Sequence, residues 1–107
     1  MISTHILDLK SGLPASGVPV KLERFEGQAW LLVASENTNP DGRIAFTPPL
    51  SSGTYRLTFI VKEHLRNAGC SPFFSEIPVV FEVTDPARKL HVPLLLSPYG
   101  YSTYRGS

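Results

Sequence analysis

Three histidines, one arginine and the end of the chain carry the groups that suit a chemical reaction. His5 and His91 each lie in a segment rich in apolar residues, where an imidazole must find polar partners or lose hydration energy. Arg43 directly follows an Asp-Gly turn, and its simplest interpretation is a solvated cation at the end of a strand. The last four residues, 104–107, bring together a phenol, a guanidinium, a hydroxyl and a terminal carboxylate.

This tail fits a small, polar, planar ligand that forms hydrogen bonds, but its composition fits an ordinary closing hairpin equally well. No standard catalytic motif surrounds the histidines: the sequence has no nucleophile elbow, no glycine-rich phosphate loop and no Cys-x-x-Cys pair. His64 lies in a charged segment and is expected to be a structural or surface residue. Cys70 has no base near it in the sequence, so we expect it to take no part in the chemistry.

Length and charge exclude several classes of protein. The 107 residues predict a single domain over 1–107. A net charge of +1 gives no electrostatic reason to expect nucleic acid or an anionic membrane as a partner. The chain has no signal peptide pattern, no peroxisomal address and no apolar run long enough for a membrane helix. We therefore expect a cytoplasmic protein.

Turn residues divide the chain into short strands. Ten prolines and eight glycines favour strands and turns over long helices. The residues 62–69 have helical chemistry, with Leu65 as the apolar anchor and Gly69 as the C-terminal cap. The fold class is therefore all-β, an antiparallel sandwich or barrel of about eight strands with one short helix. The expected strands are 3–8, 17–25, 30–36, 43–46, 53–61, 77–83, one containing His91, and one containing Tyr101 that runs to the last residue.

Three consecutive leucines, Leu94 to Leu96, make both faces of the His91 strand apolar. A sandwich strand normally exposes a polar residue at every second position. One apolar face would cover the core, and the other would meet a partner subunit.

Four segments together resemble the transthyretin-like family. They are the opening 3–18, the Asp41-Gly42-Arg43 turn, the segment 73–79 and the C-terminal stretch 91–107. The resemblance spans nearly the whole chain. The final Tyr104-Arg105-Gly106-Ser107 resembles the tetrapeptide that marks the family members that hydrolyse 5-hydroxyisourate, and it sets them apart from the thyroid-hormone carrier of the same fold. One departure is the pair Lys89-Leu90, where relatives often have a further polar residue and an aromatic.

The resemblance implies a two-sheet, transthyretin-like β-sandwich that forms a homotetramer, with active sites where pairs of dimers meet. It implies hydrolytic opening of 5-hydroxyisourate, in purine catabolism, to 2-oxo-4-hydroxy-4-carboxy-5-ureidoimidazoline, with no metal and no cofactor. We expect His5 to polarise the water, while His91 holds the ring or relays a proton. Arg43 would stabilise the oxyanion. The implied catalytic residues are His5, Arg43, His91 and Ser107, and the implied substrate-binding residues are His5, Arg43, Tyr104, Arg105 and Ser107.

Two other functions remain open on the sequence. A non-enzymatic carrier on the same fold would be favoured by an apolar site that lacks the histidine, the arginine or the polar tail. A metal site would need His5, His64 and His91 to converge, although no short ligand spacing supports it and Arg43 would repel a cation. A purely structural sandwich is the remaining possibility.

Overall fold

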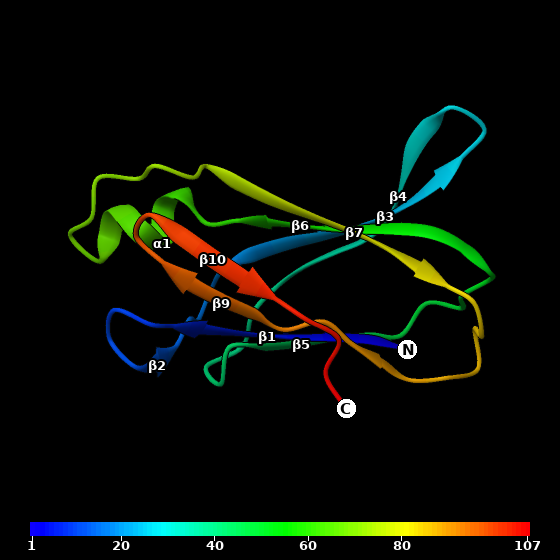
Figure 1. Cartoon of the computed structure of the whole chain (residues 1–107), viewed down its shortest axis with the longest axis horizontal. Coiled ribbons are helices and arrows are strands. Elements are labelled where there is room, and N and C mark those ends of the chain that lie inside the picture. Colours follow the sequence, from blue (N-terminus) through cyan, green and yellow to red (C-terminus); the bar gives the residue numbers. More distant parts are fainter.

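The computed structural model describes residues 1–107 and consists of two β-sheets packed face to face, with one short helix at one end (Figure 1). The six-stranded sheet contains β1 (Ile2–Asp8), β2 (Leu13–Pro14), β5 (Arg43–Phe46), β8 (Leu90–His91), β9 (Leu94–Ser97) and β10 (Gly100–Thr103). The four-stranded sheet contains β3 (Pro19–Glu26), β4 (Ala29–Asn37), β6 (Gly53–Ile60) and β7 (Glu76–Val83). This arrangement confirms the expected all-β sandwich.

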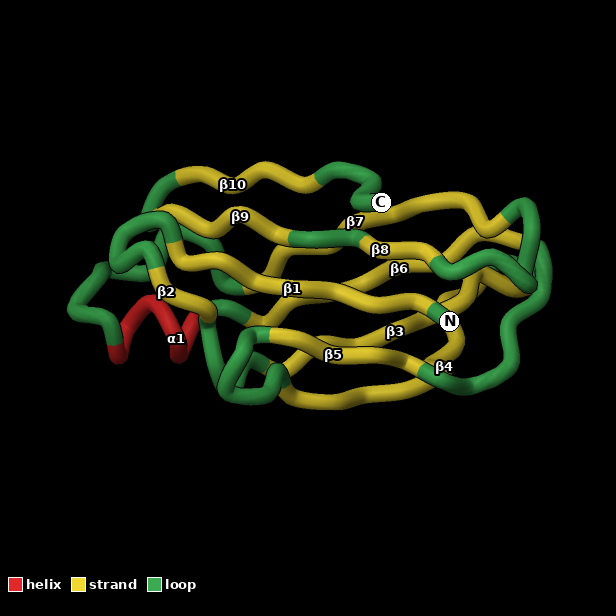
Figure 2. The backbone as a smooth tube through the Cα atoms, turned by 90° about the horizontal axis from the view of Figure 1, so that it is seen from below, coloured by secondary structure: helices red, strands yellow, loops and turns green.

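Strand β1 is the centre of the six-stranded sheet. It pairs antiparallel with β5 and β2 along one edge and parallel with β8 and β9 along the other, and β10 lies outside β9 (Figure 2). The parallel pairs depart from the antiparallel expectation, because the last part of the chain returns to lie beside the first. The strand that carries His5 thus lies between the one that begins at Arg43 and the one that ends at His91.

Burial alternates along β1 as the sequence pattern predicts. Ile2, Thr4, Ile6 and Asp8 are buried, whereas the residues between them are only partly buried. Ile2 and Ile6 join a core of 18 buried hydrophobic residues. His5 and its neighbours on the same face therefore lie on the outer surface of the six-stranded sheet.

The structure has ten strands rather than eight. The expected His91 strand is divided into β8 and β9, because Pro93 has no N–H to donate at the junction. A two-residue strand, β2, pairs with the end of β1.

The expectation that the last strand runs to the final residue is wrong. β10 ends at Thr103, where its pairing with β9 stops at Leu94, the residue after Pro93. The Thr103 hydroxyl donates to the Pro93 carbonyl at 2.8 Å. Beyond this point the tail leaves the sheet edge and makes an isolated bridge to His91 through Gly106.

The expected helix is present as α1 (Lys62–Asn67), with Leu65 buried. Gly69 has φ +80°, the left-handed conformation that ends many helices. At six residues α1 is far too short to span a bilayer, and no helix of the chain meets the length and apolarity that this requires.

Candidate active site

Arg43 is placed beside His5 by the turn that starts β5. The two residues are direct cross-strand partners in the β1–β5 pair, so their side chains share the outer face. The Asn39 side-chain oxygen accepts hydrogen bonds from the backbone N–H groups of Asp41 (3.0 Å) and Arg43 (2.9 Å). Gly42 has φ +73°, and a Cβ there would lie 2.7 Å from the Ile6 carbonyl. Only glycine lets this turn close against β1.

His91 is held by a serine from the opposite end of the chain. Ser3 and His91 are paired residues of the parallel strands β1 and β8. The Ser3 hydroxyl lies 2.9 Å from His91 Nδ1, and it donates to the Leu90 carbonyl at 3.4 Å. Because the Ser3 hydroxyl donates its proton to the Leu90 carbonyl, the Ser3 oxygen accepts a hydrogen bond from the Nδ1–H of His91. The other ring nitrogen, Nε2, then carries a lone pair and has no protein partner.

Gly106 of the tail packs directly against the His91 ring. The Gly106 N–H donates to the His91 carbonyl at 2.7 Å. A Cβ at Gly106 would lie 2.5 Å from the ring carbon Cδ2, which is far inside van der Waals contact. The glycine is therefore required for the tail to lie along the imidazole, and the next residue, Ser107, borders the same depression as His91.

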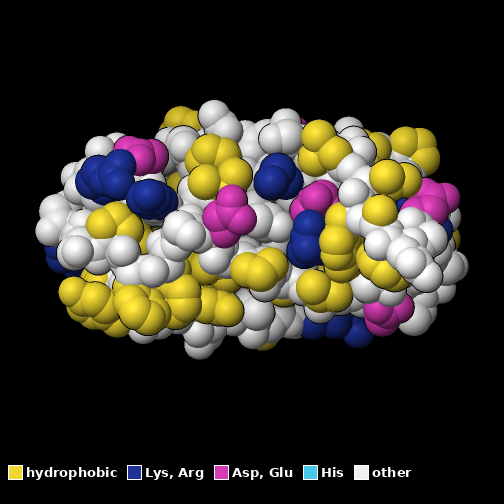
Figure 3. All heavy atoms as spheres, turned by 90° about the horizontal axis from the view of Figure 1, so that it is seen from above, with side chains coloured by type: hydrophobic (Ala, Val, Ile, Leu, Met, Phe, Trp, Pro, Cys, Tyr) yellow, Lys and Arg dark blue, Asp and Glu magenta, His cyan; other side chains and the backbone are white.

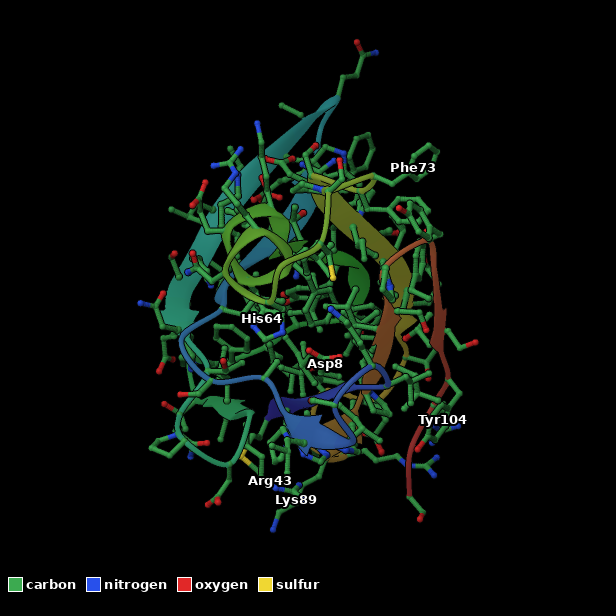
Figure 4. All side chains as sticks on the ribbon, turned by 90° about the vertical axis from the view of Figure 1, so that its left-hand side faces the viewer. Asp8, Arg43, His64, Phe73, Lys89 and Tyr104 are labelled. Carbon is green, nitrogen blue, oxygen red and sulfur yellow. The ribbon has the colours of Figure 1, made fainter.

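A shallow depression of about 350 Å³ lies on the outer face, lined by Met1, Ser3, Arg43, Lys89, Leu90, His91 and Ser107. His5 is not among the lining residues, but it lies beside Arg43 as its cross-strand partner. Figure 4 shows Arg43 and Lys89 on the same side of the sandwich, both pointing away from it. The opposite face of the molecule, over the four-stranded sheet, shows mixed charged and apolar side chains and no histidine (Figure 3). The depression combines cationic groups, an imidazole and a hydroxyl.

The electrostatic surroundings of His5 favour its neutral form. Partial burial lowers the pKa of His5 below its ordinary value of 6.5, and electrostatic interactions with the Arg43 guanidinium and the nearby His91 ring lower it further. The nearby Asp41 acts in the opposite direction through its backbone carbonyl and its carboxylate, but its effect is smaller. His5 is thus a neutral imidazole near pH 7 and can accept a proton.

Two of the predicted site residues lie elsewhere in this chain. Tyr104 and Arg105 border a second cavity of about 210 Å³, which is also lined by Val79 and Phe81 of β7. Ser107 therefore shares the depression with His91 and Arg43, whereas the first two residues of the tetrapeptide face away from it. The substrate-binding role of Tyr104 and Arg105 stays a prediction.

Comparisons with known proteins identify the family of this chain. A family model described as "Transthyretin: HIUase/Transthyretin family" matches residues 2–106. The chain belongs to this family. It is 43% identical to the 5-hydroxyisourate hydrolase of Mus musculus, with 99% of this chain and 94% of the mouse protein covered.

Solved structures of two kinds resemble this member of the HIUase/transthyretin family. Klebsiella pneumoniae 5-hydroxyisourate hydrolase matches with a TM-score of 0.85 and 42% identity, over 99% of this chain and 98% of that one. Transthyretin from Sparus aurata matches with a TM-score of 0.92 and 30% identity, over 98% and 95%. The backbone alone thus does not separate the hydrolase from transthyretin.

The fold does not bring the three histidines together. His64 Nε2 forms an ion pair with Asp8 Oδ2 at 2.8 Å, whereas His91 bonds to Ser3. Ser3 and Asp8 lie near opposite ends of β1, about 16 Å apart at the usual rise of a strand. Burial alone would raise the pKa of Asp8, but the hydrogen bonds from His64, Lys10 N–H and Ser11 N–H lower it overall. His64 is a structural residue, as its sequence context suggested.

Sequence reasoning missed Ser3, Asn39 and Lys89 as parts of the candidate site. The alternation of β1 already placed Ser3 on the face of His5, but nothing local shows that β8 lies alongside, because Ser3 and His91 are 88 residues apart. The Asn39-Pro40-Asp41-Gly42 turn was recognisable as a turn, and its role in placing Arg43 was not.

Proposed function

We propose that this chain hydrolyses 5-hydroxyisourate to 2-oxo-4-hydroxy-4-carboxy-5-ureidoimidazoline. The observation that carries the proposal is the outer-face cluster of His5, Arg43, His91 and Ser107, in a family member that is more than 40% identical to named hydrolases. The cluster supplies a base, a fixed cation and hydrogen-bonding groups for a planar ring. These are the groups that opening of a cyclic amide-like bond needs.

In the proposed reaction His5 is the base. Its neutral imidazole takes a proton from a water molecule while the water oxygen bonds to a ring carbonyl carbon. Arg43 stabilises the negative charge that develops on the carbonyl oxygen. The carbon–nitrogen bond then breaks, its electron pair stays on nitrogen, and His5 returns the proton to that nitrogen.

His91 holds the substrate ring. Because Ser3 engages Nδ1, the Nε2 atom is the acceptor that faces the depression, and it receives a hydrogen bond from a ring N–H of the substrate. Ser107, which borders the same depression as His91, contributes its hydroxyl to the same ligand. Tyr104 and Arg105 are also proposed to bind the substrate, in the assembled protein rather than in the single chain.

We further propose a homotetramer in which a second copy covers this outer face. The depression is open on one side in the single chain, and enclosure would exclude water and strengthen every charged interaction within it. Leu95 supports this assembly, because it lies beside Leu7 in the β1–β9 register and both are only partly buried on the outer face.

The transthyretin-type carrier is the alternative that the fold itself allows. The side chains favour the enzyme, because a carrier has no need for a neutral imidazole beside an arginine. The higher sequence identity to the hydrolases than to Sparus aurata transthyretin points the same way.

The proposal is tested by generating 5-hydroxyisourate in the cuvette with urate oxidase and following its ultraviolet decay. We expect the purified protein to accelerate the decay in proportion to its concentration, and the Arg43→Gln variant to lose most of that acceleration. Decay at the spontaneous rate would remove the hydrolase, and tight binding of thyroxine by the same preparation would then support a carrier.

A further inference from the structure

We infer that Lys89 and Arg43 form a carboxylate subsite that receives the acid group created by ring opening. This inference rests on the proposed hydrolase function and assigns Lys89 a role in it. The sequence suggested only that Lys89 replaces another polar residue of the family. The position of Lys89 in the structure suits it to bind the carboxylate of the product.

The strand geometry directs Lys89 into the site. Leu90 packs against the core, and its N–H donates to the Met1 carbonyl at 2.9 Å, which fixes β8 against β1. Side chains alternate along a strand, so the residues on either side of Leu90 both point outward. Lys89 therefore shares the outer face with His91, and both line the depression with Arg43.

The positive charges of Arg43 and Lys89 are only partly balanced by the protein. The ion pairs of the molecule are Arg56–Glu23, His64–Asp8 and Arg66–Glu63, and neither Arg43 nor Lys89 takes part in one. No aspartate or glutamate lines the depression. The terminal carboxylate of Ser107 offsets one of these two positive charges, so the depression keeps a net positive charge that attracts an anion.

The proposed reaction creates such an anion. Water adds to the carbonyl, the carbon–nitrogen bond breaks, and the nitrogen gains a proton. The carbonyl carbon becomes a carboxylic acid, which loses its proton to solvent near pH 7. One negative charge therefore appears where none was before, and an ammonium group on a long flexible stem can follow it as the ring opens.

The test measures inhibition by the product itself. Ureidoimidazoline product is made by complete turnover of 5-hydroxyisourate and added at once to fresh assays of the wild type, Lys89→Gln and Lys89→Arg. We expect the inhibition constant of the product to rise about fivefold in Lys89→Gln, the size that one exposed lysine–carboxylate pair supports. Lys89→Arg keeps the charge and should stay within about twofold of wild type on the same basis.

The adjacent Arg88 is the matched control, because it lines the other cavity. Arg88→Gln removes the same charge one residue away and should leave the product inhibition constant unchanged. An active wild type with no measurable product inhibition, or equal constants for wild type and Lys89→Gln, would overturn the subsite. An equal rise of the product inhibition constant in Arg88→Gln would also overturn it, because the effect would then come from the overall positive charge of the surface. A wild type that does not accelerate 5-hydroxyisourate decay would instead reject the hydrolase function.

Discussion

At the scale of single residues, hydrogen bonds and nearby charges set the state of each imidazole. Ser3 fixes which nitrogen of His91 faces the depression, and Arg43 acts with partial burial to keep His5 neutral. These surroundings support the different roles that we propose for the two histidines, which lie on adjacent strands. This division follows from contacts that are distant in the sequence.

Replacing Ser3 by alanine tests the orientation of His91. Without the hydroxyl, the ring can rotate and exchange tautomers, and we expect kcat for 5-hydroxyisourate to fall about tenfold, the equivalent of one hydrogen bond of about 1.4 kcal/mol. Ser3→Thr retains the hydroxyl and should restore the rate. Equal kcat values for Ser3→Ala and wild type in the ultraviolet assay would show that the bond has no catalytic role.

The pKa of His5 provides a second prediction. Because that pKa lies below 6.5, the catalytic rate should fall only when the pH drops below this value and the base becomes protonated. Arg43→Gln removes one of the positive charges that disfavour the imidazolium, so the pKa of His5 should move up towards 6.5. Imidazole resonances followed by NMR during a pH titration measure both values. A wild-type His5 that titrates at or above 6.5 would contradict the assignment of His5 as the neutral base.

At the scale of elements, the site depends on three segments that meet on the outer face: β1, the turn before β5, and the tail that crosses β8. The tail is the least regular of them, since β10 ends at Thr103 and Gly106 alone bridges to His91. Its position depends on the absence of a side chain at Gly106.

Gly106→Ala is therefore expected to displace the tail or the His91 ring. The added Cβ would lie 2.5 Å from Cδ2 of the ring, so we predict a loss of kcat of about tenfold or more, comparable with other losses of catalytic positioning. The thermal midpoint should change little, because the tail is largely exposed. Gly100→Ala is the matched control, as a Cβ there meets no atom within 4 Å. Similar activity of the two variants would contradict the packing of the tail on His91.

The secondary-structure elements were largely predictable from the sequence, but the contacts between them were not. Alternation along β1 placed His5 outward, and the helix with its buried Leu65 matched its pattern. The parallel pairing of β8 with β1 depends on contacts between residues about ninety positions apart in sequence, which local periodicity does not encode. The end of β10 was missed because Pro93 acts across the strand pair rather than within β10.

At the scale of the whole molecule, the outer face of the six-stranded sheet carries both the site and the apolar Leu7–Leu95 pair. An isolated chain would leave this face in water. The family resemblance predicted the site residues and the tetramer together, whereas composition and strand pattern predicted only the sandwich and an apolar outer face.

The assembly is tested by placing a charge on that face. We expect the wild type to sediment at about four times the chain mass of 11.8 kDa. Leu95→Lys puts an ammonium group into the proposed interface, so it should sediment at a lower mass and lose activity at the same time. Leu32→Lys, on a leucine of β4 that is 62% exposed, should change neither. A fully active monomeric wild type would contradict the tetramer.

The most direct test of the central claim is the rate of 5-hydroxyisourate decay with His5→Gln beside wild type. Glutamine preserves hydrogen bonding but cannot take the proton of the attacking water, so we predict that kcat falls at least about a hundredfold while the protein stays folded. Arg56→Gln, on the other sheet, should keep the wild-type rate. A His5→Gln variant that matches wild type would contradict the proposed base and the outer-face site built around it.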